Sequence, residues 1–313
     1  MRGLRPIIFA PVLAALCLAS CNSLPKDAPP PSGTLTEGDG AAARLFSEAT
    51  ALEAAGKSGK AEKTYDRVAT KYRYSKVAPE ARFRQAVLLD RKGEILDAFD
   101  AYEDFIQNYP SSSLYTQALS RQAVVAHAAA DGQIKNSFLG LKSRLDPKKI
   151  TEMLGKVREN APQAPSAPKA QFAIGEVWES EKRAPQAIDA FEEVIDNYST
   201  STYAPEAQYR IGAILLNQAA RGNQNQANLD RARHSFEDLL QQYPGSPRDA
   251  DARARLREIA SRDVQRSFDI AEFYFKKGEQ TSAAFYYKEV IRNSPSGTLH
   301  DRAQQRLAKI SGS

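Results

Sequence analysis

The sequence predicts an all-α protein, a solenoid of about six helical pairs that follows an export signal and a flexible linker. Apolar residues recur with helical spacing from residue 41 onward. A short proline-containing motif recurs along the chain, and small and aromatic residues keep fixed distances from it. With 42% hydrophobic and 26% charged residues, the chain is able to bury a core beneath a charged surface.

Residues 1–20 have the pattern of a secretory signal. Arg2 and Arg5 precede an apolar run, residues 7–18, that is too short to span a bilayer comfortably. The run ends in LASC, residues 18–21, which resembles the lipobox of bacterial lipoproteins. This resemblance implies that Cys21 is acylated and anchors the mature chain to a membrane. The alternative is an ordinary cleavage site with a chance cysteine.

Residues 21–41 are predicted to form a flexible linker after the acylated cysteine. The stretch is rich in proline, glycine and small polar residues and has almost nothing to bury. Asn22 follows the cysteine, and by analogy with the sorting rule of Gram-negative lipoproteins it favours the outer membrane. Both cysteines of the chain, Cys17 and Cys21, lie before residue 22, so no disulfide or thiolate site is expected after that point.

The repeated pattern covers roughly residues 42–310. A motif such as NYP ends a helical segment at five points. Before each lies an alanine, then an aromatic residue four positions later, then an apolar residue three positions after that. This spacing puts all three on one helix face. The five sets are Ala61, Tyr65 and Val68; Ala98, Tyr102 and Phe105; Ala187, Phe191 and Val194; Ala232, Phe236 and Leu239; and Ala283, Tyr287 and Val290.

These offsets resemble those of the tetratricopeptide repeat, whose helical pairs stack into a right-handed solenoid. A sixth, degenerate copy lies at residues 150–157. Gly56, Gly93 and Gly278 precede the alanine by five positions, where we expect the turn between paired helices and a left-handed backbone. Gly56 is followed by Lys57-Ser58, as in a phosphate-binding loop, but the first glycine of that motif and a preceding strand are missing.

A proline-rich joint at residues 161–169 is predicted to divide the array into an N-terminal half, 42–160, and a C-terminal half, 161–313. Several repeats are longer than the minimal unit of about 34 residues. Insertions in a solenoid often enter loops on one face, where binding takes place. The extra length is predicted as an insertion at 132–148, a loop at 221–229 and one long helix at 251–278.

The sequence has no constellation typical of catalysis, so we expect no enzyme activity, no cofactor and no bound metal. None of the three histidines has a second histidine or cysteine at ligand spacing, and HExxH and GxSxG motifs are missing. The formal net charge of +5 includes Arg2 and Arg5 of the signal, and the remainder is too balanced to indicate nucleic-acid binding. Trp178 is expected to pack between repeats, with a carbohydrate platform as the alternative.

A solenoid of this kind predicts a binding groove lined by the first helix of each pair. Side chains at the second, fifth, ninth and twelfth positions of these helices face into it. Exposed aromatic residues with neighbouring carboxylates suit an extended or helical peptide. The alternative is that Phe46 and Phe83 are covered by the linker or by their own neighbours. The predicted groove residues are Phe46, Thr50 and Glu53; Phe83, Val87 and Asp90; and Ser120, Val124 and His127.

The lipobox, the linker and the repeats together resemble the BamD/YfiO family of outer-membrane assembly lipoproteins. The strongest match is a YPxS motif at 243–246, DAxxRL at 251–256 and AExYxxxG at 271–278, although this family usually has five repeats. The resemblance implies a non-catalytic role at the periplasmic face of the outer membrane. It also implies that the C-terminal repeats dock on a BamA-type barrel inserter, beside other assembly lipoproteins, while the N-terminal groove receives unfolded outer-membrane proteins.

The long helix carries a basic stripe, which predicts charged contacts with an acidic partner domain at Arg255, Arg262, Arg266 and Glu272. A solvated helix face is the alternative for these residues. A periplasmic scaffold of the Tol-Pal type is the alternative function. Such scaffolds have the same repeats, but usually an N-terminal coiled coil and no lipobox, whereas this sequence lacks the first and has the second.

Overall fold

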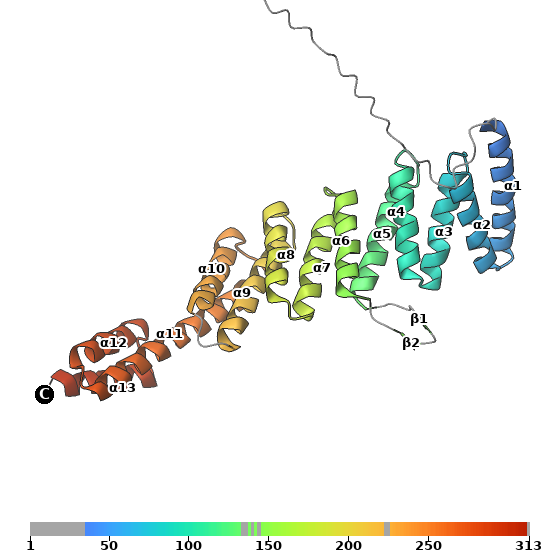
Figure 1. The fold of residues 1–313 in the computed structure, drawn as a ribbon. Helices are drawn as coiled ribbons and strands as arrows, with labels where there is room; N and C mark the ends of the chain where they lie inside the picture. Colours follow the sequence, from blue (N-terminus) through green and yellow to red (C-terminus); the bar gives the residue numbers. More distant parts are fainter. Residues whose placement is uncertain (1–34, 133–136, 139–140, 143–144, 222–225, 312–313) are drawn as a thin grey trace, which may run out of the picture. The chain divides into compact units, whose positions relative to one another are not determined.

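The computed structural model describes residues 35–132, 137–138, 141–142, 145–221 and 226–311 (Figure 1). The predicted signal, Cys21 and most of the predicted linker lie outside these residues. Within them the chain folds into helices and one two-stranded ribbon. The helices are α1 Leu35–Ala54, α2 Ser58–Lys71, α3 Ala78–Lys92, α4 Ile95–Asn108, α5 Tyr115–Ala130, α6 Pro147–Asn160, α7 Ser166–Ser180, α8 Ala184–Asn197, α9 Ala204–Arg221, α10 Gln226–Gln242, α11 Asp249–Lys277, α12 Gln280–Asn293 and α13 Thr298–Ser311.

The chain forms two compact units, an N-terminal unit that ends at Ala81 and a C-terminal unit from Arg82 to Ser313. The division falls within α3 and not at residues 161–169, where the sequence predicts a joint. On either side of that joint, α6 and α7 pack directly against each other. Ile150 of α6 and Ala170 of α7 belong to the same hydrophobic cluster, so the packing continues across the prolines.

In the N-terminal unit, α1 packs against α2. Gly56 forms the turn between them with a φ of +72°, as the repeat pattern predicts, and α2 begins two residues later. The structure therefore has a helix-to-helix turn where a nucleotide-binding loop would need a strand. Helix α1 starts at Leu35, inside the predicted linker, and Ala42 on it is fully buried. Tertiary packing at Ala42 outweighs the low helix propensity of the two glycines before it.

The residues that define the repeat are all buried, which confirms the predicted helical-repeat fold. The alanine, aromatic and apolar positions of the five sets have 0% exposure, from Ala61, Tyr65 and Val68 on α2 onward. In the degenerate copy, Ile150 and Leu154 are also fully buried. The repeated residues therefore determine how the helices pack. The small residue lets a neighbouring helix approach closely, and the aromatic ring fills the space beside it.

The long helix α11 joins two hydrophobic clusters of the C-terminal unit. Ala252 and Ile259, in its first half, pack with residues of α7 to α10. Val264 and Phe268, in its second half, pack with α12 and α13. The helix ends at Gly278, which has a φ of +79°. The sequence predicts the ends of this helix to within two residues. The helix is long because it packs against two hydrophobic clusters.

The insertions differ from the expected loops. Within the predicted insertion 132–148, β1 Ser137–Phe138 pairs with β2 Leu141–Lys142 in antiparallel register. These two short strands are the exception to the all-helical prediction among the described residues. The predicted loop at 221–229 is shorter than expected, because α9 extends to Arg221 and α10 begins at Gln226.

Candidate peptide-binding groove

The predicted groove residues of the N-terminal unit gather around one tyrosine. The Phe46 ring lies 5.5 Å from that of Tyr65, and the Thr50 hydroxyl lies 3.2 Å from the Tyr65 hydroxyl. The Tyr65 hydroxyl in turn donates a 2.8 Å hydrogen bond to Glu53. Phe46 is only half-buried. These contacts join α1 to α2, so the three predicted residues have a structural role whether or not they bind a ligand.

Phe83 does not face a groove, and its prediction as a groove residue is wrong. It is only 8% exposed, and its ring lies 6.0 Å from that of Tyr102 and 5.8 Å from that of Phe105. Both rings belong to α4, which covers this face of α3. The alternative stated from the sequence, that neighbours cover Phe83, is therefore what the structure shows.

The other two predicted residues on α3 are half-buried. Val87 packs against the same hydrophobic cluster as Phe83. The carboxylate of Asp90 lies 3.7 Å from Arg121 of α5. Burial raises the pKa of Asp90, and the guanidinium of Arg121 opposes this rise. Neither residue presents a free binding group, so α3 contributes little to a candidate site.

The predicted residues on α5 do line a hollow. Ser120, Val124 and His127 border a cavity of about 560 Å³. Lys169, near the start of α7, lines the same cavity. Val124 is 56% exposed, so part of its apolar surface is open to the hollow. The floor beside it is also apolar. The structure therefore brings together three of the nine predicted groove residues.

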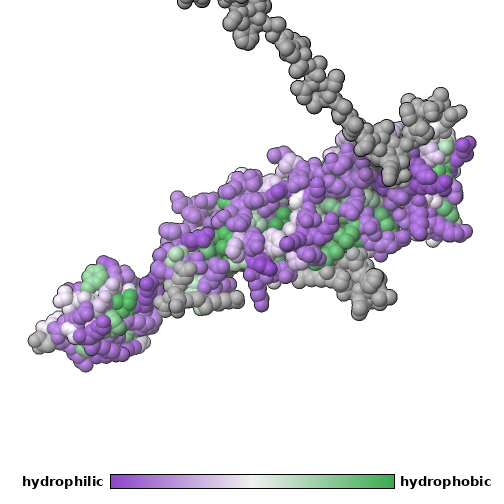
Figure 2. Space-filling view, in the orientation of Figure 1, coloured by the Kyte–Doolittle hydropathy of each residue, from purple (hydrophilic) through white to green (hydrophobic). Residues whose placement is uncertain are grey.

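A second hollow of about 520 Å³ continues the first along α7. It shares His127, Asp131 and Lys169 with the first cavity and extends to Phe172 and Glu176. The two hollows form one groove along α5 and α7, which we call the α5–α7 groove. Figure 2 shows hydrophobic atoms between hydrophilic ones in this middle part of the C-terminal unit. Each hollow by itself is within the size range of ligand-binding clefts.

The α5–α7 groove contains a histidine that is held neutral. Burial and, to a smaller extent, the nearby Lys169 lower the pKa of His127 from 6.5 to about 4, while Asp131 opposes the shift. Its Nε2 atom is enclosed and has no hydrogen-bond partner in the described part of the chain. At neutral pH the groove therefore presents an uncharged imidazole between a lysine and an aspartate.

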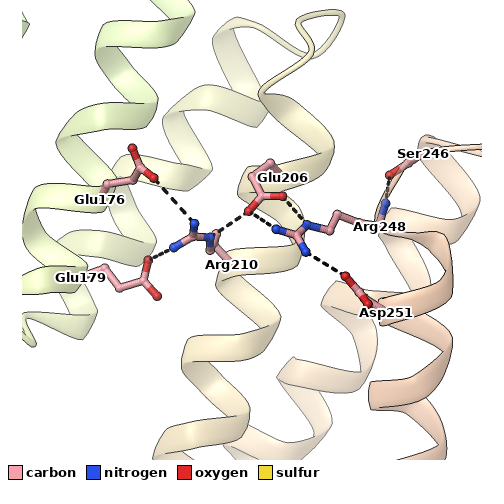
Figure 3. Close-up of polar contacts among 7 residues, drawn as sticks. All are labelled: Glu176, Glu179, Glu206, Arg210, Ser246, Arg248 and Asp251. Carbon is pink, nitrogen blue, oxygen red and sulfur yellow. Dashed lines mark hydrogen bonds and ion pairs between the residues drawn. The ribbon is translucent and has the colours of Figure 1, made fainter. Parts of the chain in front are cut away.

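The groove passes into a network of ion pairs that joins α7, α9 and α11 (Figure 3). Arg210 of α9 lies 3.6 Å from Glu176 and 2.8 Å from Glu179, both on α7. It also bonds Glu206 of its own helix at 2.9 Å. A guanidinium that serves three carboxylates fixes α9 against α7.

Arg248 extends the network to α11. It donates to Glu206 at 2.9 Å and to Asp251 at 2.8 Å, and its backbone N–H donates to the Ser246 hydroxyl at 3.0 Å (Figure 3). Burial favours the neutral form of Glu206, but hydrogen bonds from Arg248 and Arg210 outweigh burial and lower its pKa. The network thus joins α7, α9 and α11, and its charged side chains pair with one another.

The predicted docking residues on α11 differ in their surroundings. Arg255 and Arg262 bond opposite oxygens of Glu258, at 2.9 and 2.8 Å, and both remain substantially exposed. Arg266 donates to the side chain of Gln226 on α10.

Glu272, the fourth predicted docking residue, is used internally. It accepts hydrogen bonds from Arg306 of α13 at 2.8 Å and from the Tyr287 hydroxyl of α12 at 2.6 Å. Burial opposes its ionisation, but these two bonds outweigh burial and lower its pKa. Glu272 therefore links α11 to α12 and α13, and its carboxylate is not free to bind a partner.

Several residues that line the groove were not predicted, because the groove positions were assigned only in the first three repeats. Continued into α7, the second, fifth, ninth and twelfth positions are Lys169, Phe172, Glu176 and Glu179. The first three line the groove and the last belongs to the ion-pair network. Trp178, in contrast, packs against the hydrophobic cluster around Phe191, as expected of a structural residue.

Two properties of the described residues bear on function. They contain no group of three or more histidine, cysteine, aspartate or glutamate side chains that would suit a metal ion. The described helices also include none that is both long and apolar enough to span a membrane.

Comparison with known proteins gives two family matches. A model of the outer membrane lipoprotein YfiO matches residues 152–310, and a tetratricopeptide repeat model matches residues 46–113. Among curated proteins, no sequence matches this chain. The first match includes the α7 wall of the groove and all of α11.

Several solved structures show distant similarity to the chain. PilF of Pseudomonas aeruginosa is 13% identical, with 86% of this chain and 99% of PilF covered and a TM-score of 0.31. A tetratricopeptide repeat protein from Parabacteroides merdae is 13% identical, with 87% and 99% covered and a TM-score of 0.33. YrrB, a repeat protein with an unusual peptide-binding site, is 17% identical, with 72% and 91% covered and a TM-score of 0.32.

Proposed function

This chain belongs to the YfiO family of outer membrane lipoproteins, and we propose that it is a non-catalytic scaffold for the assembly of outer-membrane proteins. In this proposal it is anchored through Cys21 at the periplasmic face of the outer membrane. The α5–α7 groove holds an extended or helical segment of an unfolded outer-membrane protein. The C-terminal repeats dock on a BamA-type barrel inserter, beside other lipoproteins of the assembly complex.

The α5–α7 groove is the observation that carries the proposal. Its floor exposes Val124, and a peptide side chain that covered this residue would contribute about 1 kcal/mol from apolar burial alone. Lys169 and Ser120 at the border offer a charge and a hydroxyl for the peptide backbone or its polar side chains. A groove with an apolar floor and few polar groups at its border suits unfolded segments of varied sequence.

The C-terminal docking surface is proposed on the exposed basic residues of α11. Arg255 and Arg262 both pair with the single carboxylate of Glu258. These three residues together carry a net charge of +1, which is available to an acidic partner. Pairing of exposed charges across an interface speeds association and selects the partner more than it adds affinity. Glu272 is left out of this surface because its carboxylate is bound by Arg306 and Tyr287.

The groove proposal is tested by replacing its exposed apolar residue. We expect Val124→Asp to weaken the binding of peptides from unfolded outer-membrane proteins by about tenfold or more, because the carboxylate must be desolvated beneath the peptide. Fluorescence anisotropy of labelled peptides measures the effect. Val124→Ile is the matched control and keeps the affinity.

A second control is Phe285→Asp, at an exposed apolar residue of α12 outside the groove. This variant is expected to bind the peptides like the unchanged protein. Equal affinity of Val124→Asp and the unchanged protein would show that the groove is not the binding site.

A further inference from the structure

Helices α11 and α12 carry four neighbouring aromatic rings, of which two are exposed and two are partly buried. Phe273 of α11 is 52% exposed and Phe285 of α12 is 59% exposed. Between them the Tyr274 and Tyr286 rings are stacked, with centroids 5.8 Å apart and an interplanar angle of 8°. Phe273 lies 5.5 Å from Tyr274, and Phe285 lies 5.2 Å from Tyr286. We call these four side chains the aromatic patch.

Lysines border the aromatic patch. The Lys277 ammonium lies 4.7 Å from the centroid of the Phe273 ring. Lys276, in the same last turn of α11, is also exposed. On α12 the exposed Lys288 follows Phe285 by three positions, which places the two on one side of the helix.

Acidic residues near the patch cancel this charge only in part. Glu289 of α12 is paired with Arg292 at 3.2 Å. Asp269 of α11, which accepts a 2.8 Å hydrogen bond from the neutral amide of Gln265, and Glu279 at the start of α12 are two carboxylates against three lysines. The surface is therefore apolar at its centre and cationic at its border.

This composition fits a phospholipid surface better than a protein. Cores of protein interfaces are rich in aromatic residues but poor in lysine. Aromatic and apolar side chains bordered by lysines are typical of segments that lie at the boundary between headgroups and acyl chains. Lysines at such a surface are attracted by anionic lipids. We propose that the aromatic patch is a bilayer contact of this protein, with Phe273 and Phe285 entering the boundary region.

The contact rests on the proposed membrane anchoring of the chain. A chain already held at a bilayer meets its lipids at a high effective concentration, so the anchor strengthens a contact that the patch also makes by itself. The contact then restricts which side of the C-terminal unit faces the membrane. It adds a lipid-binding site to a scaffold whose proposed partners are proteins.

Vesicle binding of the mature chain with Cys21→Ser, which has no acyl anchor, tests this proposal. We expect it to co-sediment with vesicles of phosphatidylethanolamine and phosphatidylglycerol and much less with phosphatidylcholine vesicles. Binding to the anionic vesicles should weaken with added salt. The double substitution Phe273→Ser and Phe285→Ser should reduce this binding by about tenfold or more. Both rings are largely exposed, so circular dichroism should show an unchanged fold.

The matched control is Val124→Ser, an exposed apolar residue in the α5–α7 groove, which should leave vesicle binding unchanged. Absence of binding to anionic vesicles, or equal binding by the double variant, would overturn the proposal. Loss of a co-purified protein in the double variant, without vesicle binding by the parent chain, would identify the patch as a protein interface and also overturn it. Neither result affects the groove, which is tested separately at Val124.

Discussion

His127 gives the α5–α7 groove a built-in sensitivity to acid. Its imidazole is enclosed between α5 and α7, with Lys169 and Asp131 as the charged groups that face it. Burial and Lys169 favour the neutral ring, and Asp131 favours the charged ring. Burial and Lys169 prevail, so the His127 ring is protonated only under acidic conditions or when the local packing is disturbed.

This balance predicts how stability changes with pH. The pKa of His127 is about 4 in the folded state, compared with an ordinary value of 6.5. The unfolded chain therefore takes up a proton first as the pH falls. The stability due to the neutral ring is fully present above pH 6.5 and is lost as the pH falls towards 4. Replacing His127 by Gln should reduce this loss, as measured by urea unfolding at several pH values.

His234 supplies the control for the pH prediction. Its side chain is 72% exposed and lies 3.4 Å from Glu237, so His234→Gln should retain the acid sensitivity of the unchanged protein. If His127→Gln and the unchanged protein lose stability in parallel between pH 6.5 and 4, burial of His127 is not the cause.

At the residue scale, the sequence predicts the core better than the groove. The alanine and aromatic positions follow from fixed spacing, because each helix must bury the same face. Phe83 shows where spacing fails: its position in the repeat is that of a groove residue, but Tyr102 and Phe105 on the next helix enclose its ring. Exposure at such a position depends on the size of the neighbouring side chains, which spacing does not specify.

Two helical pairs, α7 with α8 and α9 with α10, leave no room for a Cβ atom at one position each. A Cβ atom at Gly175 would lie 2.4 Å from a ring carbon of Phe191, and one at Gly212 of α9 would lie 2.7 Å from Phe236 of α10. The corresponding position in other pairs is an alanine, as at Ala86. Glycine is therefore required in these two pairs by contact distance, since both positions are inside helices.

We expect Gly175→Ala to lower the free energy of unfolding by about 1–3 kcal/mol, because the enclosed Phe191 ring has to move. Thermal or urea unfolding measures this change. Gly155→Ala in α6 is the control, since no atom lies within 4 Å of its Cβ position. That substitution should stabilise by up to about 1 kcal/mol through helix propensity. Equal effects of the two substitutions would show that α7 and α8 are not in tight contact.

At the element scale, the sequence predicts helices from their interior and misses what depends on neighbours. The long helix α11 is predicted well because its apolar pattern is continuous and Gly278 ends it. The early start of α1 is missed because Gly38 and Gly40 resemble linker residues, and only packing of Ala42 explains the helix. The strands β1 and β2 are missed because two-residue strands leave no periodic signal.

At the scale of the C-terminal unit, helical packing and the ion-pair network divide the surface into parts. Between α7 and α11 the carboxylates and guanidinium groups pair with one another, so this stretch offers few free charges. The α5–α7 groove keeps an exposed apolar floor beside the network. Helices α11 and α12 carry the aromatic patch. The same scaffold thus separates a site for a polypeptide from a surface for a second contact.

Site-specific photo-crosslinking in cells tests the central claim most directly. A photoreactive amino acid at Val124, inside the groove, should form adducts with outer-membrane proteins that are still being assembled, identified by mass spectrometry. The same probe at Arg253, an exposed residue of α11, should not form them. Adducts at both positions alike, or none at Val124 while the protein is anchored and folded, would contradict the assignment of the α5–α7 groove as the binding site.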